Sequence, residues 1–217
     1  NTNYEVKDGV LFTKGLLRLV NYPQAKKVSN YVVPAGVKEI ASYAIASNPY
    51  MTSIDFNQVT KINVSALISL GGLKRLTIPK DLKQAGLAEG AFEACQAIES
   101  YEVAAGNTDF AAEDGVLFSA NKETLYFYPL AKPQTSYTIP SSVKTIGVKS
   151  FKDARKLTAL IIPTNVEYIN EQAFRSIHNL TAVKFLEQSK LKKINNYVFW
   201  QCARLKEVTL PTSITEI

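Results

Sequence analysis

The sequence predicts a solenoid of short repeats, a right-handed β/α superhelix with parallel strands on one face, short helices on the other and inserted β-hairpins. Three observations predict this fold. A long segment of the chain occurs twice, a shorter apolar pattern recurs within both copies, and proline follows that pattern at a fixed place. A single repeat of this kind cannot bury its apolar face, so stacked neighbours have to supply the core.

The long duplication has an offset of 106 positions. Residues 30–45 read NYVVPAGVKEIASYAI, and residues 136–151 read SYTIPSSVKTIGVKSF. The same offset aligns DGVLF at 8–12 with DGVLF at 114–118, and the Tyr-Pro pair at 22–23 with the pair at 128–129. A large unit has therefore been copied.

A shorter unit recurs inside each copy. Its aliphatic reference positions, called anchors below, are Ile40, Ile62, Leu87, Ile146, Ile169 and Ile194. Apolar residues stand eleven, fourteen and sixteen positions after each anchor, so the pattern L-x-x-L-x-L appears six times. A bulky apolar side chain also recurs five positions after each anchor, as Ile45, Leu67, Phe92, Phe151, Phe174 and Phe199.

This pattern at a spacing near 23 residues is typical of leucine-rich repeats, in which each unit adds one short strand to a parallel sheet. The last two apolar positions of the motif are two residues apart. Their side chains therefore share the inner face of a strand, while the residues between them face outward. The bulky residue five positions after the anchor is expected to meet them from the opposite wall.

Proline marks the ends of the predicted strands, because its fixed φ and missing N–H end a ladder of hydrogen bonds. It follows the last inward residue of five strands, as Pro34, Pro79, Pro140, Pro163 and Pro211. We expect the strands to end at Val33, Phe56, Ile78, Val103, Ile139, Ile162, Phe185 and Leu210. No proline follows Phe56, Val103 or Phe185, and the next spacing is irregular each time, which indicates rebuilt turns.

Two stretches do not fit the short unit and are predicted to form β-hairpins, one from Asp8 to Tyr22 and one from Asp114 to Tyr128. We therefore expect one solenoid domain over residues 1–217. It would have a hairpin cap at 1–30, repeat units at 31–105, an inserted hairpin at 106–135 and repeat units at 136–217. The chain stops on Ile217, where the next anchor falls, so we expect the solenoid to continue or to be capped beyond it.

The segments LTALIIPTNVEYINEQAF at 157–174 and LKEVTLPTSITEI at 205–217 resemble BspA-like leucine-rich repeats, and the similarity runs over about residues 31–217. The resemblance implies a bacterial protein outside the cytoplasm, secreted or at the cell surface, with a role in adhesion to host matrix proteins or other cells. Cys95 and Cys202 stand at the family's cysteine position. Other repeats place Asn48, Leu70, Ala154 and Ile177 there, which favours a small buried side chain over thiol chemistry.

The composition argues against several classes of function. Two cysteines and one histidine are too few for a disulfide framework or a zinc site, so we expect no metal and no cofactor. The sequence has no G-x-S-x-G, H-E-x-x-H or P-loop motif, and the lone His178 is more typical of a surface residue than of a catalyst. No apolar run approaches the roughly 18 residues that span a bilayer. We therefore predict that the chain is not an enzyme and holds no transmembrane segment.

The outward residues of the strands are the candidate binding surface, because the curvature of a solenoid exposes a ladder of side chains on its concave face. The candidates are Asp55, Lys74, Arg75, Thr77, Glu99, Glu102, Lys184, Lys206 and Glu207. Neither sign of charge dominates and aromatic residues are absent, so a weak binder and a merely solvated sheet fit equally well. Other aromatic candidates, about half of them expected in the core, are Tyr126, Phe127 and Tyr128 in the second hairpin and Trp200 on the convex side.

With the family resemblance, which alone implies the surface location and the host partner, we expect a monomeric, non-enzymatic cell-surface module that binds a protein partner, such as a host matrix or cell-surface protein. The alternative is a structural spacer of a longer surface protein, with no ligand of its own. The net charge of +6 comes from basic clusters that fall on different faces, so we do not expect nucleic acid as a partner.

Overall fold

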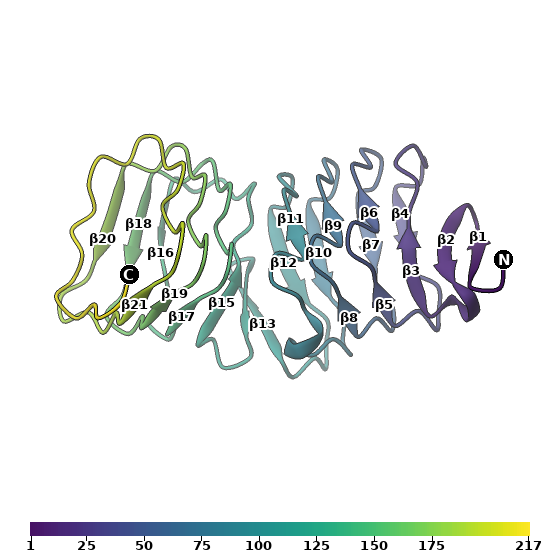
Figure 1. The fold of residues 1–217 in the computed structure, drawn as a ribbon, viewed down its shortest axis with the longest axis horizontal. Coiled ribbons are helices and arrows are strands. Elements are labelled where there is room, and N and C mark those ends of the chain that lie inside the picture. Colours follow the sequence, from purple (N-terminus) through teal and green to yellow (C-terminus); the bar gives the residue numbers. More distant parts are fainter. The chain divides into compact units, whose positions relative to one another are not determined.

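The computed structural model describes residues 1–217, which form two compact units (Figure 1). The first unit comprises Asn1–Ala112 and the second comprises Glu113–Ile217. Both are β-solenoids in which each coil of the chain stacks on the next. The duplication seen in the sequence corresponds to these two units.

The first unit arranges its strands on three sides of each coil. One sheet holds, in order, β1 (Tyr4–Lys7), β2 (Val10–Thr13), β3 (Arg18–Asn21), β5 (Glu39–Ile40) and β8 (Lys61–Ile62). The side that we call the strand face has two separate pairs, β4 (Asn30–Val32) with β7 (Ser53–Asp55) and β10 (Arg75–Ile78) with β12 (Ser100–Val103). The turn side holds β6 (Ile45–Ala46), β9 (Leu67–Ile68) and β11 (Phe92–Glu93).

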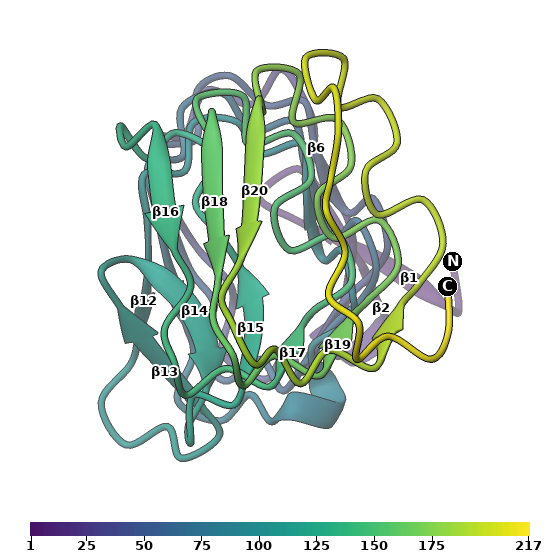
Figure 2. The ribbon, with the colours of Figure 1, turned by 90° about the vertical axis from the view of Figure 1, so that its left-hand side faces the viewer.

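The second unit has two sheets. The strand face is one continuous sheet of β16 (Ser136–Thr138), β18 (Ala159–Ile162) and β20 (Ala182–Phe185), seen side by side in Figure 2. The other sheet of the second unit runs in the order β14 (Val116–Ser119), β15 (Thr124–Phe127), β17 (Thr145–Ile146), β19 (Tyr168–Ile169) and β21 (Lys193–Ile194). The strand β13 (Phe110–Glu113) contains the boundary of the two units and precedes β14 in the chain. The turn side of this unit consists of turns alone.

The strands of the strand face agree with the repeat pattern. Seven of the eight predicted strands form and end within one residue of the expected position. Neighbouring coils pair in parallel with equivalent residues opposite, as Leu76 with Tyr101 and Leu160 with Val183. These inward residues make the core because every second side chain of a strand points the same way.

The eighth predicted strand, expected to end at Leu210, does not form, and the Leu210 side chain is 39% exposed. The coil that leads to this segment contains a lengthened turn after Phe185. A hollow lined by residues 183–189 and 209–212 lies between this segment and β20, and the segment forms no strand.

The expected short helices are absent, and the prediction of a β/α superhelix is wrong in this respect. The helical elements are two three-residue 3-10 turns, η1 (Lys14–Leu16) and η2 (Gln84–Gly86). On the turn side, backbone N–H groups donate to the next coil, as from Tyr43 N to Ser65 O (3.0 Å) and from Ser47 N to Ile68 O (2.9 Å). An α-helix needs these groups for its own i−4 bonds. Tyr43 and Ser47 also have positive φ values, 58° and 50°, which a right-handed helix excludes.

Both expected hairpins form. β2 pairs antiparallel with β3, and β14 pairs antiparallel with β15. The last strand of each hairpin then pairs in parallel with the first coil, β3 with β5 and β15 with β17. Each hairpin thus continues a solenoid sheet at the start of its unit.

One strand that the repeat pattern does not predict precedes each hairpin, β1 before the first and β13 before the second. The connection to the following strand is an Asp-Gly turn in which both residues have positive φ, 50° and 74° at Asp8 and Gly9 and 48° and 75° at Asp114 and Gly115. Such values are typical of the type I′ hairpin turn.

A lysine holds each Asp-Gly turn. Lys26 Nζ donates to Asp8 O (2.5 Å), and the equivalent Lys132 Nζ donates to Asp114 O (2.5 Å). Lys132 also pairs with the Asp114 carboxylate (3.0 Å) and is only 5% exposed, whereas Lys26 is half-buried. The same contact is therefore more deeply buried in the second unit.

Candidate binding surface

Six of the nine predicted surface residues share the strand face of the first unit. Asp55 lies on β7, and Glu102 lies on β12. Arg75 and Thr77 lie on β10, while Lys74 and Glu99 directly precede β10 and β12. All are exposed except Thr77, which is half-buried. Strand alternation gives Arg75 and Thr77 a common side on β10, while Lys74 and Glu99 lie at the starts of their strands.

Several of these polar side chains bind each other. Lys74 Nζ lies 3.1 Å from Glu99 Oε1, and Thr77 Oγ1 donates to Glu102 Oε2 (3.4 Å). Exposed pairs of this kind contribute little to stability because water competes for both partners. Arg75, by contrast, forms no ion pair and is available to an external group.

The other three predicted residues belong to the second unit. Lys184 lies on β20 and is exposed. Lys206 and Glu207 are exposed as well, but they lie in the segment that does not form a strand. Their side chains therefore lack the fixed alternation that a strand gives.

The turns that follow the strands have a standard length. Where proline is present, the turn runs over five residues, counted from the last inward residue of the strand, as from Val33 to Val37. The N–H of the fifth residue donates to the proline oxygen, as from Val37 to Pro34 (3.2 Å) and from Val143 to Pro140 (3.0 Å). The three turns without proline depart from this pattern, each in its own way.

The turn after Phe56 is one residue short. It runs over four residues, and Val59 N donates to Phe56 O (3.1 Å). Asn57 takes a positive φ of 53°, and its N–H donates to Asp55 Oδ1 (2.8 Å). Phe56 and Ile78 are consequently 22 residues apart, against 23 for the equivalent Ile162 and Phe185. The coil with the short turn is also the one across which β7 and β10 fail to join one sheet.

A hollow of about 350 Å³ opens at this interruption, on the strand face of the first unit. Buried or half-buried apolar groups line it together with polar ends from β7, β10 and the residues after them. The lining residues are Ile54, Asp55, Phe56, Asn57, Thr77, Pro79, Lys80 and Ala104. We call this site the β7–β10 hollow.

The turn after Phe185 is too long by two residues, and a second hollow of about 450 Å³ lies beside it in the second unit. Residues 183–189 line one side of the hollow and residues 209–212 line the other. Both hollows therefore lie where a turn departs from the five-residue length.

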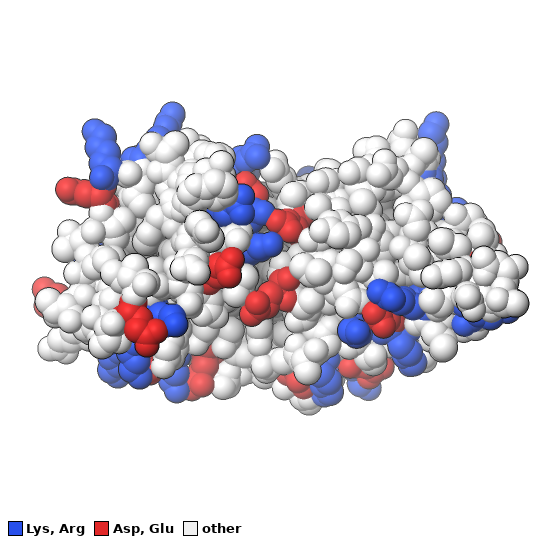
Figure 3. All heavy atoms as spheres, viewed as in Figure 1, with Lys and Arg blue, Asp and Glu red and all other residues white.

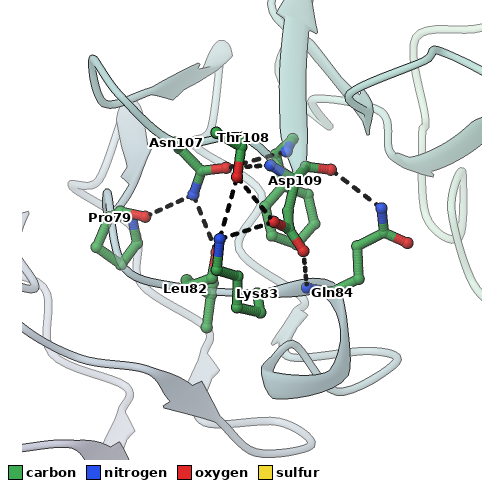
Figure 4. Close-up of polar contacts among 8 residues, drawn as sticks. Pro79, Leu82, Lys83, Gln84, Asn107, Thr108 and Asp109 are labelled. Carbon is green, nitrogen blue, oxygen red and sulfur yellow. Dashed lines mark hydrogen bonds and ion pairs between the residues drawn. The ribbon is translucent and has the colours of Figure 1, made fainter.

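The third turn without proline, after Val103, is filled by polar contacts (Figure 4). Asn107 Nδ2 donates to Pro79 O (2.8 Å) and Leu82 O (3.0 Å). The Asp109 carboxylate accepts from Lys83 Nζ (3.0 Å) and from Gln84 N (3.2 Å). Lys83 above all, then the Gln84 amide, holds the pKa of Asp109 below its usual value. This network fixes the segment against η2.

The cysteines and the histidine play no part in either hollow. Cys95 Sγ donates to Leu67 O (3.6 Å), and Cys202 Sγ donates to Phe174 O (3.1 Å), each on the preceding coil. Burial raises the pKa of Cys95 to about 11 and raises that of Cys202 as well, which disfavours the reactive thiolate. His178 is exposed.

The aromatic candidates divide clearly. Phe127 and Tyr128 are buried and Tyr126 is half-buried, so the second hairpin uses its aromatic residues mainly for packing. Trp200 is 48% exposed. Basic and acidic side chains are interspersed on the face drawn in Figure 3, where neither sign forms a stripe.

Sequence reasoning did not identify the residues of the β7–β10 hollow other than Asp55 and Thr77. The signal was present, because Phe56 lacks a following proline and its coil is short. The consequence for the pairing of β7 with β10 depends on hydrogen-bond register, which a sequence pattern does not specify. None of the elements is a helix with the length and apolar character needed to cross a membrane.

Comparison with known families finds one match that covers most of the chain. The family described as BspA type leucine rich repeat region matches in six copies, over residues 22–113 and 125–217. No protein of curated function matches the sequence.

Solved structures of bacterial proteins have the same fold. The pneumococcal vaccine antigen PcpA is 23% identical over 88% of this chain and 55% of its own, with a TM-score of 0.72. A leucine rich cell surface protein from Faecalibacterium prausnitzii is 22% identical over 88% of this chain and 55% of its own, with a TM-score of 0.68. The chain thus spans about half the length of these two structures, and at such identities the likeness concerns the fold alone.

Proposed function

The chain belongs to the BspA-type leucine-rich repeat family, and from this premise we propose that it is a non-enzymatic protein-binding module of a bacterial surface protein. The description of the Faecalibacterium prausnitzii structure as a cell surface protein supports this location. We further propose adhesion to host matrix proteins or other cells as the form of binding. A repeat scaffold does not specify a function, so the argument has to come from a site.

The observation that carries the proposal is the β7–β10 hollow. Its volume of about 350 Å³ lies within the range of ligand sites, roughly 300–1,000 Å³. Phe56 and Pro79 give it buried apolar surface, while Asp55 and Lys80 place opposite charges in its lining. An apolar side chain of a partner can enter such a hollow while its backbone binds the polar groups, which is the usual anatomy of an interface anchor.

The exposed Lys80 side chain lies next to Gly106. It passes over Gly106, where a Cβ atom would approach Lys80 Cε to 3.1 Å. Gly106 also has a positive φ of 84°, which glycine adopts at little cost. The Lys80 side chain therefore packs beside the turn after Val103, the one filled by polar contacts.

A turn graft tests the proposal. Replacing the Asn57-Gln58 pair with Pro-Thr-Asn, the segment found at Pro163–Asn165, restores the five-residue turn in the first unit. We expect β7 and β10 to join, the hollow to close and binding to be lost while the fold persists. Biolayer interferometry against immobilised fibronectin and fibrinogen, at about 0.05 M and about 0.3 M salt, separates specific contacts from charge alone.

The matched control changes a standard turn of the second unit. Thr164→Ala with Asn165→Gly copies the Pro34-Ala35-Gly36 turn and leaves the turn length unchanged. Binding should persist in this variant. If the graft and the control both bind as well as the parent chain, the β7–β10 hollow is not the binding site.

One observation favours the spacer function as the second candidate. The Lys74–Glu99 and Thr77–Glu102 contacts use polar groups of the strand face internally and leave fewer for a partner. A spacer would show no saturable binding at the higher salt concentration to either matrix protein.

A further inference from the structure

An aromatic and basic row of side chains lies on the turn side of the second unit. Lys152, Arg175 and Trp200 each stand six residues after an anchor, on three successive coils. The Arg175 guanidinium carbon lies 4.1 Å from the centre of the Trp200 ring system. The Tyr197 ring packs edge-on against Trp200, with 6.2 Å between centroids. We call these four residues the Trp200 row.

The geometry of the row is fixed by its own contacts. Arg175 Nη1 donates to Gln172 Oε1 (2.7 Å), which orients the guanidinium over the indole. Arg175 Nε is buried and makes no hydrogen bond. Cation–π contacts of this kind are worth about 0.5–2 kcal/mol and keep both groups ordered before a partner arrives.

The aromatic side chains of the row remain in contact with solvent. Trp200 is 48% exposed and Tyr197 is 62% exposed. Large aromatic side chains can bury about 150–250 Å² each, so leaving two of them in contact at the surface forgoes much apolar burial. Trp, Tyr and Arg are also the residue types most enriched among interface hot spots.

The first unit shows that the repeat itself does not require this row. The equivalent positions, six residues after the anchors, hold Ala46, Ile68 and Glu93. The coils of the first unit stack with the same backbone hydrogen bonds, as from Ser47 N to Ile68 O (2.9 Å), where the second unit has Ser176 N to Trp200 O (2.8 Å). Stacking of coils therefore does not explain Arg175 and Trp200.

Charge indicates the chemistry of a partner. Basic residues outnumber acidic ones on these turns, with Lys149, Lys152, Arg155, Arg175 and Arg204 against Asp153 and Glu171. Arg155 and Arg204 are exposed and form no ion pair. The Arg175 guanidinium likewise contacts an amide and a ring but no carboxylate. A carboxylate from outside would satisfy these guanidinium groups, and an apolar neighbour would cover the exposed rings.

We propose that the Trp200 row is a docking surface for an acidic segment of a protein partner that carries carboxylates next to aromatic or aliphatic side chains. The proposal extends the proposed protein-binding function to a second surface. The hollow lies in the first unit and the row in the second, so a variant of one leaves the other intact.

The chain itself supplies the reporter, because Trp200 is its one tryptophan. A synthetic peptide of alternating Glu and Phe residues is added to the full chain while tryptophan emission is recorded. We expect a saturable shift of the emission to shorter wavelength as the indole leaves water. A peptide of alternating Lys and Phe residues, with the same apolar content, should produce no such shift.

Two variants locate the contact. Arg175→Met keeps an unbranched apolar side chain but removes the charge, and it should raise the Kd for the Glu/Phe peptide by about tenfold or more. Lys7→Gln removes an exposed charge from the first unit, outside the row, and should change the Kd by less than about twofold. Circular dichroism melts of both variants show whether the fold is retained.

Three results would overturn the proposal. They are an equal response to the Lys/Phe peptide, an unchanged Kd in Arg175→Met, and a response to heparin with none to the Glu/Phe peptide, which would assign the row to an anionic polysaccharide. The turn graft in the first unit should leave the emission shift unchanged. That comparison separates a failure of this proposal from a failure of the hollow.

Discussion

The two units close their coils differently on the turn side. In the first unit, Ile45, Leu67 and Phe92 begin the short strands β6, β9 and β11. In the second unit the equivalent positions hold Phe151, Phe174 and Phe199, whose ring centroids are 5.4 Å and 5.6 Å apart along a column. There the chain makes a tighter turn, in which Arg175 N donates back to Gln172 O (3.1 Å).

The bonds between coils are nevertheless equivalent. Ile45 N donates to Ala66 O (3.0 Å) in the first unit, and Phe151 N donates to Ala173 O (2.8 Å) in the second. The ladder between coils therefore builds the solenoid in both units. The local backbone five residues after the anchor is extended in the first unit and turned in the second, and a Phe occurs in both, as Phe92 in β11 and Phe174 in a turn.

Truncating the aromatic column should have the largest effect. Phe174 is fully buried between Phe151 and Phe199, so Phe174→Ala should lower the free energy of unfolding by about 3–5 kcal/mol. Guanidinium unfolding followed by Trp200 fluorescence reports on the second unit. A midpoint equal to that of the parent chain would show that the column does not hold this unit together.

Leu67→Ala makes the equivalent change in the first unit, where Leu67 is also fully buried. It should lower stability by about 2–5 kcal/mol, measured by hydrogen exchange of first-unit amides. Comparison of the two variants shows whether a strand or a turn at this position tolerates the loss better.

The two lysines that hold the Asp-Gly turns should differ in importance. Lys132→Met removes a deeply buried ammonium and leaves Asp114 O without its donor, which should cost about 1–3 kcal/mol. Lys26→Met should cost less, because water can reach the half-buried site and replace the bond. Thermal melts of the two variants compare them directly, and equal losses would mean that burial does not set the strength of this contact.

A smaller effect is expected from pH. Hydrogen bonds from Lys83 and Gln84 lower the pKa of Asp109 in the first unit, and the Lys192 contact lowers that of Glu167 in the second. A carboxyl whose pKa is depressed by folding stabilises the native state above its unfolded pKa, about 3.9 for Asp and 4.3 for Glu, and this contribution is lost as pH falls through the folded value.

Hydrogen exchange measured between about pH 6 and pH 3 tests the contribution of Asp109. Protection of the Gln84 amide should fall with acid in the parent chain and should lose that dependence in Asp109→Asn. Because both carboxyl groups are at the surface, the change should be modest. An acid dependence that persists in Asp109→Asn would assign it to another group.

Much of the fold was predictable because its determinants are local and repeated. Alternation at Leu160 and Ile162 gives a strand face, and Pro163 ends it, so seven of the eight strands of this face could be placed from the spacing. The helices were predicted wrongly because apolar spacing does not show that the N–H groups of Tyr43 and Ser47 donate to another coil. The hollow was missed for a similar reason, since the absence of one residue after Phe56 acts through pairing between β7 and β10.

The contacts of exposed side chains were less predictable from the sequence than the strands. Strand alternation predicts an outward position for Arg75 and Glu102, which lie exposed on β10 and β12, while Lys74 precedes β10. Whether these residues bind a partner remains a proposal. Contacts such as Arg175 on Trp200 join residues 25 positions apart and depend on the exact stacking of coils.

The hairpins at the start of each unit bear on how such a chain can change its length. Asp8 and Asp114 stand 106 positions apart at equivalent turns, and each hairpin supplies the strand on which the next coil is laid. A tandem copy of this block brings its own starting template. A gene that gains or loses a whole block would then encode a longer or shorter solenoid in which each first coil still pairs with its own hairpin. The length of the solenoid would change without any change in the residues of a binding surface.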